Sequence, residues 1–164
     1  MKIEDTLGRS ELFLGLENNE LKMIASLPST KQECYPAGHT LFKAGDRAKN
    51  IYVLEEGQIE IVAETITNDQ AKPVTVDIIT KGGIVGWSAL VRPSSYVLSA
   101  VCETSCSMTA ISGGELLALF DREHEIGHKV FQGLSHIIGS SYRDLQQVLI
   151  KGKRWPFIEK HAST

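Results

Sequence analysis

Residues 35–62 of the chain read YPAGHTLFKAGDRAKNIYVLEEGQIEIV. Its pieces HTLF, NIYVLE and QIEIV are short and rich in β-branched and aromatic residues, which is typical of strands. Between them lie PAGH, AGDRA and EEG, whose glycines (Gly38, Gly45 and Gly57) let a chain reverse tightly at little cost. The stretch therefore predicts short strands joined by glycine turns.

The same pattern extends outward over residues 30–111. Further β-rich pieces are TKQECY (30–35), PVTVDII (73–79), YVLSAVCE (96–103) and SCSMTAIS (105–112). Many short strands at regular spacing favour a barrel or a sandwich. On both sides the hydrophobic period changes to that of helices: Ser10 can cap a turn at Glu11, and Asn18 or Asn19 can cap the run ELKMIASL, which Pro28 ends. After Ser112 we expect a short helix and then a long one from about Arg122 to Ile150.

Composition narrows the possible roles of the chain. It has 164 residues, 42% of them hydrophobic, and a net charge of −3, which argues against broad electrostatic binding of nucleic acid. No apolar run approaches the length of a membrane span, and the start is too polar for a signal peptide. Three cysteines (Cys34, Cys102 and Cys106) fit reduced thiols, so we expect a cytoplasmic protein.

The order of elements and the positions of the glycines together resemble the cyclic-nucleotide-binding domain family, which includes the catabolite activator protein and the regulatory subunits of cyclic-AMP-dependent kinase. The matching residues are Gly38, the pair Gly45–Asp46, Gly57, Gly82 and Gly86. The resemblance covers residues 10–150. It implies a mainly β fold: an eight-stranded double-stranded β-helix (a jelly roll, or β-roll), with N-terminal helices and a long C-terminal helix. We therefore expect one domain over 1–150, with helices in 3–27, the roll in 30–111, helices in 112–150, and a tail over 151–164.

The family's phosphate-binding cassette has a pattern close to F-G-E-(L/I)-A-L, followed after some residues by R-(A/S/T)-A. In family terms the glycine starts a short helix whose N–H groups face the cyclic phosphate, the glutamate binds the ribose hydroxyl and the arginine neutralises the phosphate. Residues 85–90, VGWSAL, keep Gly86, Ala89 and Leu90. The glutamate position falls on Trp87, and the arginine position on Tyr96, or on Val97 if the loop is one residue longer.

Both charged residues of the cassette are therefore absent. Removing the partner of a desolvated charge costs about 3–5 kcal/mol, roughly a hundred- to several-thousandfold in affinity. We expect no cofactor and no tight binding of cyclic AMP or cyclic GMP. The interpretation is a stand-alone regulatory sensor module, not an enzyme, with an unidentified small-molecule effector or none.

Three interpretations of the pocket stay open. Arg92 could swing in as a substitute cation for a cyclic nucleotide, with Ser94 or Ser95 adding hydroxyls. Trp87 could fill the ribose and base space and leave a closed scaffold. Trp87 and Tyr96 could instead line a more apolar cavity for a different effector. The candidate ligand-binding residues are Gly86, Trp87, Ser88, Ala89, Leu90, Arg92, Ser94, Ser95 and Tyr96.

The long helix carries an apolar seam whose members advance by three or four residues. Its residues are Val130, Leu134, Ile137, Ser141, Leu145 and Val148. Such a seam suits a second helix, so we expect a homodimer through this helix; the alternative is that the stripes serve one intramolecular core. A protein partner is also compatible with a signalling module. Since only 14 residues follow Ile150 in this sequence, there is no room here for a groove-reading helix-turn-helix, and we expect no DNA binding by the chain itself.

Residues 124–128 read HEIGH and match the zinc-peptidase pattern H-E-x-x-H, in which His124 and His128 would be metal ligands and Glu125 the general base. The third-ligand positions of the extended pattern hold Phe131 and Leu134 instead. His136 would lie about 12 Å beyond His128, too far to close a tetrahedral site. We therefore expect no metal site, with a zinc metallopeptidase as the alternative.

Overall fold

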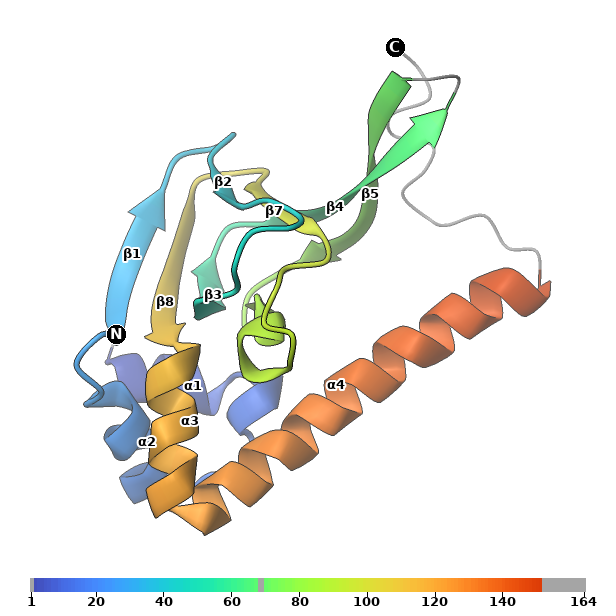
Figure 1. Ribbon diagram of the computed structural model, residues 1–164. Helices are drawn as coiled ribbons and strands as arrows, with labels where there is room; N and C mark the ends of the chain where they lie inside the picture. The colour runs from blue at the N-terminus through green and yellow to red at the C-terminus, as the bar shows by residue number, and fades with distance from the viewer. Residues whose placement is uncertain (1, 68–69, 152–164) are drawn as a thin grey trace.

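The computed structural model describes residues 2–67 and 70–151 and contains, within them, eight strands in two four-stranded antiparallel sheets (Figure 1). The strands are β1 (Lys31–Tyr35), β2 (Thr40–Phe42), β3 (Asn50–Glu56), β4 (Ile59–Thr67), β5 (Gln70–Ile79), β6 (Ile84–Val85), β7 (Ser99–Cys102) and β8 (Cys106–Ser112). The helices are α1 (Ile3–Gly8), α2 (Asn18–Ala25), α3 (Gly113–Arg122) and α4 (His124–Lys151), with 3₁₀ helices η1 (Glu11–Phe13) and η2 (Trp87–Leu90). This confirms the eight-stranded roll with helices at both ends.

The chain passes repeatedly from one sheet to the other, as in a jelly roll, and only β4 and β5 follow each other within one sheet. One has the strand order β1-β8-β3-β6 and the other β2-β7-β4-β5. In the first sheet β3 pairs with β8, so that Ile51 lies opposite Ile111 and Val53 opposite Thr109. All four side chains are fully buried, and the helices α1 and α3 contact the strands of this sheet.

The helix starts follow local hydrogen bonding. Ser10 Oγ accepts the Leu12 N–H (3.3 Å), which confirms Ser10 as the cap of η1. The expectation for α2 was wrong: the helix begins at Asn18 itself, and the residue before it, Glu17, donates its N–H to Glu20 Oε2 (2.7 Å). Neither Asn18 nor Asn19 is therefore the cap.

The long helix α4 begins at His124, two residues later than expected, because Glu123 leaves helical geometry (φ −117°, ψ 77°) and separates α4 from α3. Its first half packs on η1 and α3. Two residues of the expected dimer seam, Val130 and Leu134, are buried inside this chain (0% and 2% exposed), which corrects their assignment to a partner helix. These two residues belong to the intramolecular core, which was the alternative expectation for the seam.

The remainder of the seam differs. Ile137 is half-buried and Ser141 is exposed, while the side chains of Leu145 and Val148 lie outside the described part of the structure. The tail expected over 151–164 also lies, after Lys151, outside it. No helix among the described residues combines the length and apolar character needed to cross a bilayer.

Candidate ligand-binding pocket

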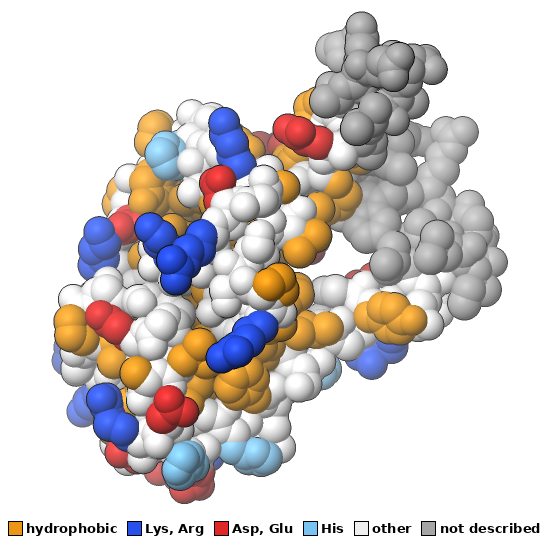
Figure 2. Space-filling view, in the orientation of Figure 1, with side chains coloured by type: hydrophobic (Ala, Val, Ile, Leu, Met, Phe, Trp, Pro, Cys, Tyr) orange, Lys and Arg blue, Asp and Glu red, His pale blue; other side chains and the backbone are white. Residues whose placement is uncertain are grey.

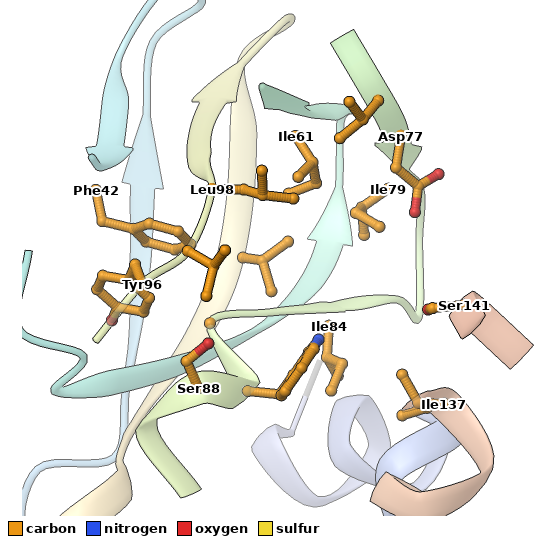
Figure 3. A pocket seen from close by; sticks show the side chains of 15 residues that line it. Phe42, Ile61, Asp77, Ile79, Ile84, Ser88, Tyr96, Leu98, Ile137 and Ser141 are labelled. Atoms are coloured by element: carbon orange, nitrogen blue, oxygen red, sulfur yellow. The ribbon is translucent and has the colours of Figure 1, made fainter. Parts of the chain in front are cut away.

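The roll encloses a cavity of about 260 Å³ that opens toward α4. It lies between β4, β5, β6 and the η2 turn, with the segment before β7 on another side (Figure 3). In the space-filling view, hydrophobic side chains gather along the hollow between the roll and α4 (Figure 2). The lining residues are Phe42, Ile61, Val76, Asp77, Ile79, Ile84, Val85, Gly86, Trp87, Ser88, Tyr96, Val97, Leu98, Ile137 and Ser141.

The turn into η2 depends on Gly86. Its φ is +82°, a left-handed conformation that side-chain-bearing residues avoid. A Cβ added there would lie 2.6 Å from the carbonyl oxygen of Asn50 in β3, so the backbone of the turn is pressed against the sheet. From this turn Trp87 and Ser88 reach the cavity, whereas Ala89 and Leu90 are buried beneath it and do not line it.

Tyr96 occupies the position of the missing arginine and is held in three ways. Its ring stacks on Phe42 with centroids 3.7 Å apart and 13° between planes. Its hydroxyl donates to the Asn50 carbonyl oxygen (2.8 Å) and accepts the Asn50 N–H (3.3 Å). Burial raises the pKa of Tyr96, so the side chain is neutral at physiological pH. The polar end of this residue is therefore used by the protein itself and is not offered to a ligand.

Trp87 is half-buried and forms part of the wall, and the cavity remains beside it. The cavity in the structure thus matches the third interpretation, in which Trp87 and Tyr96 line an apolar space. The space is not closed by the indole.

The loop that carries Arg92 does not contribute to the cavity. Arg92, Ser94 and Ser95 are all absent from the lining, and Arg92 is exposed. The loop is tied to the segment before β3: the Ser94 carbonyl accepts the Ala48 N–H (2.8 Å) and Ser95 forms a β-bridge with Arg47. Arg92 would reach the pocket only if this segment changed its conformation.

Asp77 is the single charged residue among the lining residues. Asp77 is exposed at the mouth, and partial desolvation by the surrounding wall raises the pKa of its carboxyl group, while the Ile78 N–H, which donates to Oδ1 (2.8 Å), opposes the shift. The pocket wall therefore contains an acid and no lysine, arginine or histidine.

Sequence reasoning missed this acid, since it lies on β5, far along the chain from the cassette. In the pairing of β4 with β5, Ile61 lies opposite Asp77 and Val62 opposite Thr75, so Val76 is an extra residue, a β-bulge. The bulge allows the neighbours Val76 and Asp77 both to line the cavity. The simple alternation of PVTVDII gives no sign of it.

Comparison with known proteins settles the family. The model of the cyclic nucleotide-binding domain matches residues 32–123, more than half of the chain. The chain belongs to the cyclic nucleotide-binding domain family. No curated protein matches it.

Solved structures show the same fold. A putative cyclic nucleotide-binding protein from Geobacter metallireducens GS-15 superposes with a TM-score of 0.72 at 24% identity, over 85% of this chain and 98% of that one. A cyclic nucleotide-binding domain from Methylobacillus flagellatus KT gives 0.77 at 16% identity, over 93% and 83%. The catabolite activator protein of Thermus thermophilus gives 0.70 at 22% identity, over 85% of this chain and 63% of the activator.

In the described part of this cyclic nucleotide-binding domain, no third metal ligand lies with the residues of the HEIGH motif. Glu125 lies 3.7 Å from Lys129 Nζ, one turn on, and His136 Nε2 lies 3.5 Å from Glu11 Oε1. Among the residues placed by the structure, no group of three or more histidine, cysteine, aspartate or glutamate side chains is positioned to hold a metal ion.

Proposed function

We propose that this chain is a regulatory ligand-binding module that has kept the cyclic-nucleotide-binding fold but takes an apolar effector in place of cyclic AMP or cyclic GMP. The observation that carries the proposal is the chemistry of the pocket wall. Its lining is apolar apart from a few polar groups, and its single charge is the carboxylate of Asp77.

A cyclic phosphodiester would enter such a pocket without a counterion. The cost of leaving a desolvated charge unpaired is about 3–5 kcal/mol, which is roughly a hundred- to several-thousandfold in affinity. The Tyr96 hydroxyl cannot offset this cost, because both of its hydrogen bonds go to Asn50. An ionised Asp77 would add repulsion to the deficit. Micromolar signalling by a cyclic nucleotide is therefore disfavoured on two counts.

The proposed output of the module is α4. Ile137 and Ser141 of this helix line the pocket, so an effector would touch it directly. Beyond them Tyr142 is 59% exposed, and Phe131 on the first half is 39% exposed, which leaves apolar surface for a partner. We propose a homodimer through this surface, with a different protein as the alternative partner. A cytoplasmic location stays a prediction, which rests on three cysteines suited to a reducing compartment.

The experiment is calorimetry of the full chain with cyclic AMP and cyclic GMP, with the Arg92→Ala variant alongside. We expect no saturable binding below the millimolar range for either nucleotide. Micromolar binding in the native chain would overturn the proposal, and its loss in Arg92→Ala would show that the exposed loop supplies the missing cation. Sedimentation of the same samples over a range of concentrations tests the dimer.

A further inference from the structure

The polarity of the pocket changes in one direction from its interior to its mouth. On β5, Ile79 and Asp77 point to the same face because they are two residues apart. On α4, Ile137, Ser141 and Asp144 follow at steps of four and three, so they share a helix face. Each element thus presents an isoleucine to the cavity, followed by an aspartate along the same face.

Asp77 lies at the mouth of the pocket, on the side of α4. It lines the cavity together with Ser141 of α4, and Asp144 follows Ser141 on the same helix. Oδ1 of Asp77 accepts the Ile78 N–H (2.8 Å), which fixes the carboxyl group against its own strand. In Figure 3 the carboxylate of Asp77 extends toward Ser141 of α4, at the edge of the cavity. A positive group there would lie beside the carboxylate of Asp77.

The wall of the cavity favours a ligand with an apolar body. Isoleucine, leucine, valine and aromatic side chains make up most of the wall, and burying apolar surface is worth about 25 cal/mol per Å². A cavity of about 260 Å³ is close to the lower end of the range for small-molecule pockets, so the molecule must be compact.

We propose that the pocket binds a compact apolar amine, with its hydrocarbon or aromatic body in the cavity and its ammonium group at the mouth beside the carboxylate of Asp77. This inference rests on the proposed function and narrows it from an apolar effector to a cationic one. A carboxylate of the same shape meets an acid at the same place and is rejected.

The experiment uses three probes of equal chain length: n-octylamine, n-octanol and n-octanoate, titrated by calorimetry into the full-length chain. We expect one amine per chain, bound about tenfold more tightly than the alcohol, with the carboxylate weakest. In Asp77→Asn the amine should lose about five- to tenfold in affinity while the alcohol is unchanged. Asp121→Asn, at an exposed position on α3 away from the pocket, is the matched control and should alter none of the three.

Location is tested with Ser141→Trp, which adds bulk at the exposed rim without touching the core and should abolish binding of the amine. If the alcohol binds as well as the amine and Asp77→Asn has no effect, the charge inference fails while an apolar pocket stands. If the carboxylate binds most tightly, or if no probe binds, the inference is overturned. Micromolar binding of cyclic AMP in parallel would overturn the proposed function as well.

Discussion

Replacing Gly86 by alanine tests whether the turn at the pocket is held in shape by the sheet behind it. Gly86 has φ +82°, and an L-residue in the left-handed region costs about 1–2 kcal/mol. The new Cβ would also lie 2.6 Å from the Asn50 carbonyl oxygen and 3.3 Å from the Tyr96 ring. The carbonyl oxygen belongs to the backbone of β3, where Asn50 pairs with Ser112 of β8, so it cannot move aside freely.

Overpacking of this kind costs about 1–3 kcal/mol more, so the total loss of unfolding free energy for Gly86→Ala is about 2–5 kcal/mol. The matched control is Gly45→Ala. Gly45 has a similar φ of +91°, but no described atom lies within 4 Å of its added Cβ. The control should therefore lose only the conformational part, about 1–2 kcal/mol.

The assay is urea unfolding of both variants and the native chain, followed by circular dichroism. For a chain of this size each kcal/mol corresponds to about 2–4 °C in Tm, so thermal scans give an independent check. We expect Gly86→Ala to be the less stable variant by about 1–3 kcal/mol. Equal stability of the two variants would refute the reasoning, because the turn could then move away from β3 and the wall of the pocket would not be fixed.

Three further outcomes follow from the same structure. Burial alone would raise the pKa of Glu20, but the backbone hydrogen bond from Glu17 and the ion pair with Lys129 together lower it below its ordinary value. The stability that Glu20 contributes is present above the ordinary pKa of a glutamate and is lost as the pH falls through the lowered pKa, so Glu20→Gln should flatten the acid limb of a stability–pH curve. Tyr96→Phe removes two hydrogen bonds to a buried strand and should cost about 1–3 kcal/mol in urea unfolding. Leu134→Ala should cost about 2–5 kcal/mol, whereas Tyr142→Ala should change monomer stability by less than about 0.5 kcal/mol and weaken any self-association seen by sedimentation.

The fold could be predicted because its signals are local. Gly38, Gly45 and Gly57 all have positive φ, a conformation that favours glycine, so the glycines in the sequence mark these turns. The strand β6 was missed as a separate piece, since two residues, Ile84 and Val85, are too few to show a period. The eighth strand was expected only because the resemblance to the cyclic-nucleotide-binding domain family implied eight strands.

The site could be predicted only in part. The cassette led to Gly86, Trp87 and Tyr96, which do line the cavity, because a continuous motif carries its own register. Asp77 and Ile137 come from β5 and α4, and no sequence pattern shows that a bulged strand and a distant helix meet at one opening.

The dimer seam illustrates the same limit in a different way. A stripe of residues spaced by three or four says that a helix is covered on one face, but it does not say by which chain. For Val130 and Leu134 the cover is η1 and α3 of the same molecule. Only contacts over long sequence distances, such as Lys129 with Glu20, reveal it.

Shape and charge have separate origins in this pocket, and this is why one can persist without the other. The turn is shaped by backbone constraints, namely the positive φ of Gly86 and its contact with Asn50, and neither involves a charged side chain. Tyr96 then satisfies the Asn50 backbone with its own hydroxyl, so the loss of a cation at this position leaves no vacant polar group. On the opposite side, the ion pair of Lys129 with Glu20 anchors the first half of α4, while the second half meets the roll at the pocket mouth. A molecule bound there would add contacts to the less anchored half, and differential contacts of this kind are what shift a conformational equilibrium.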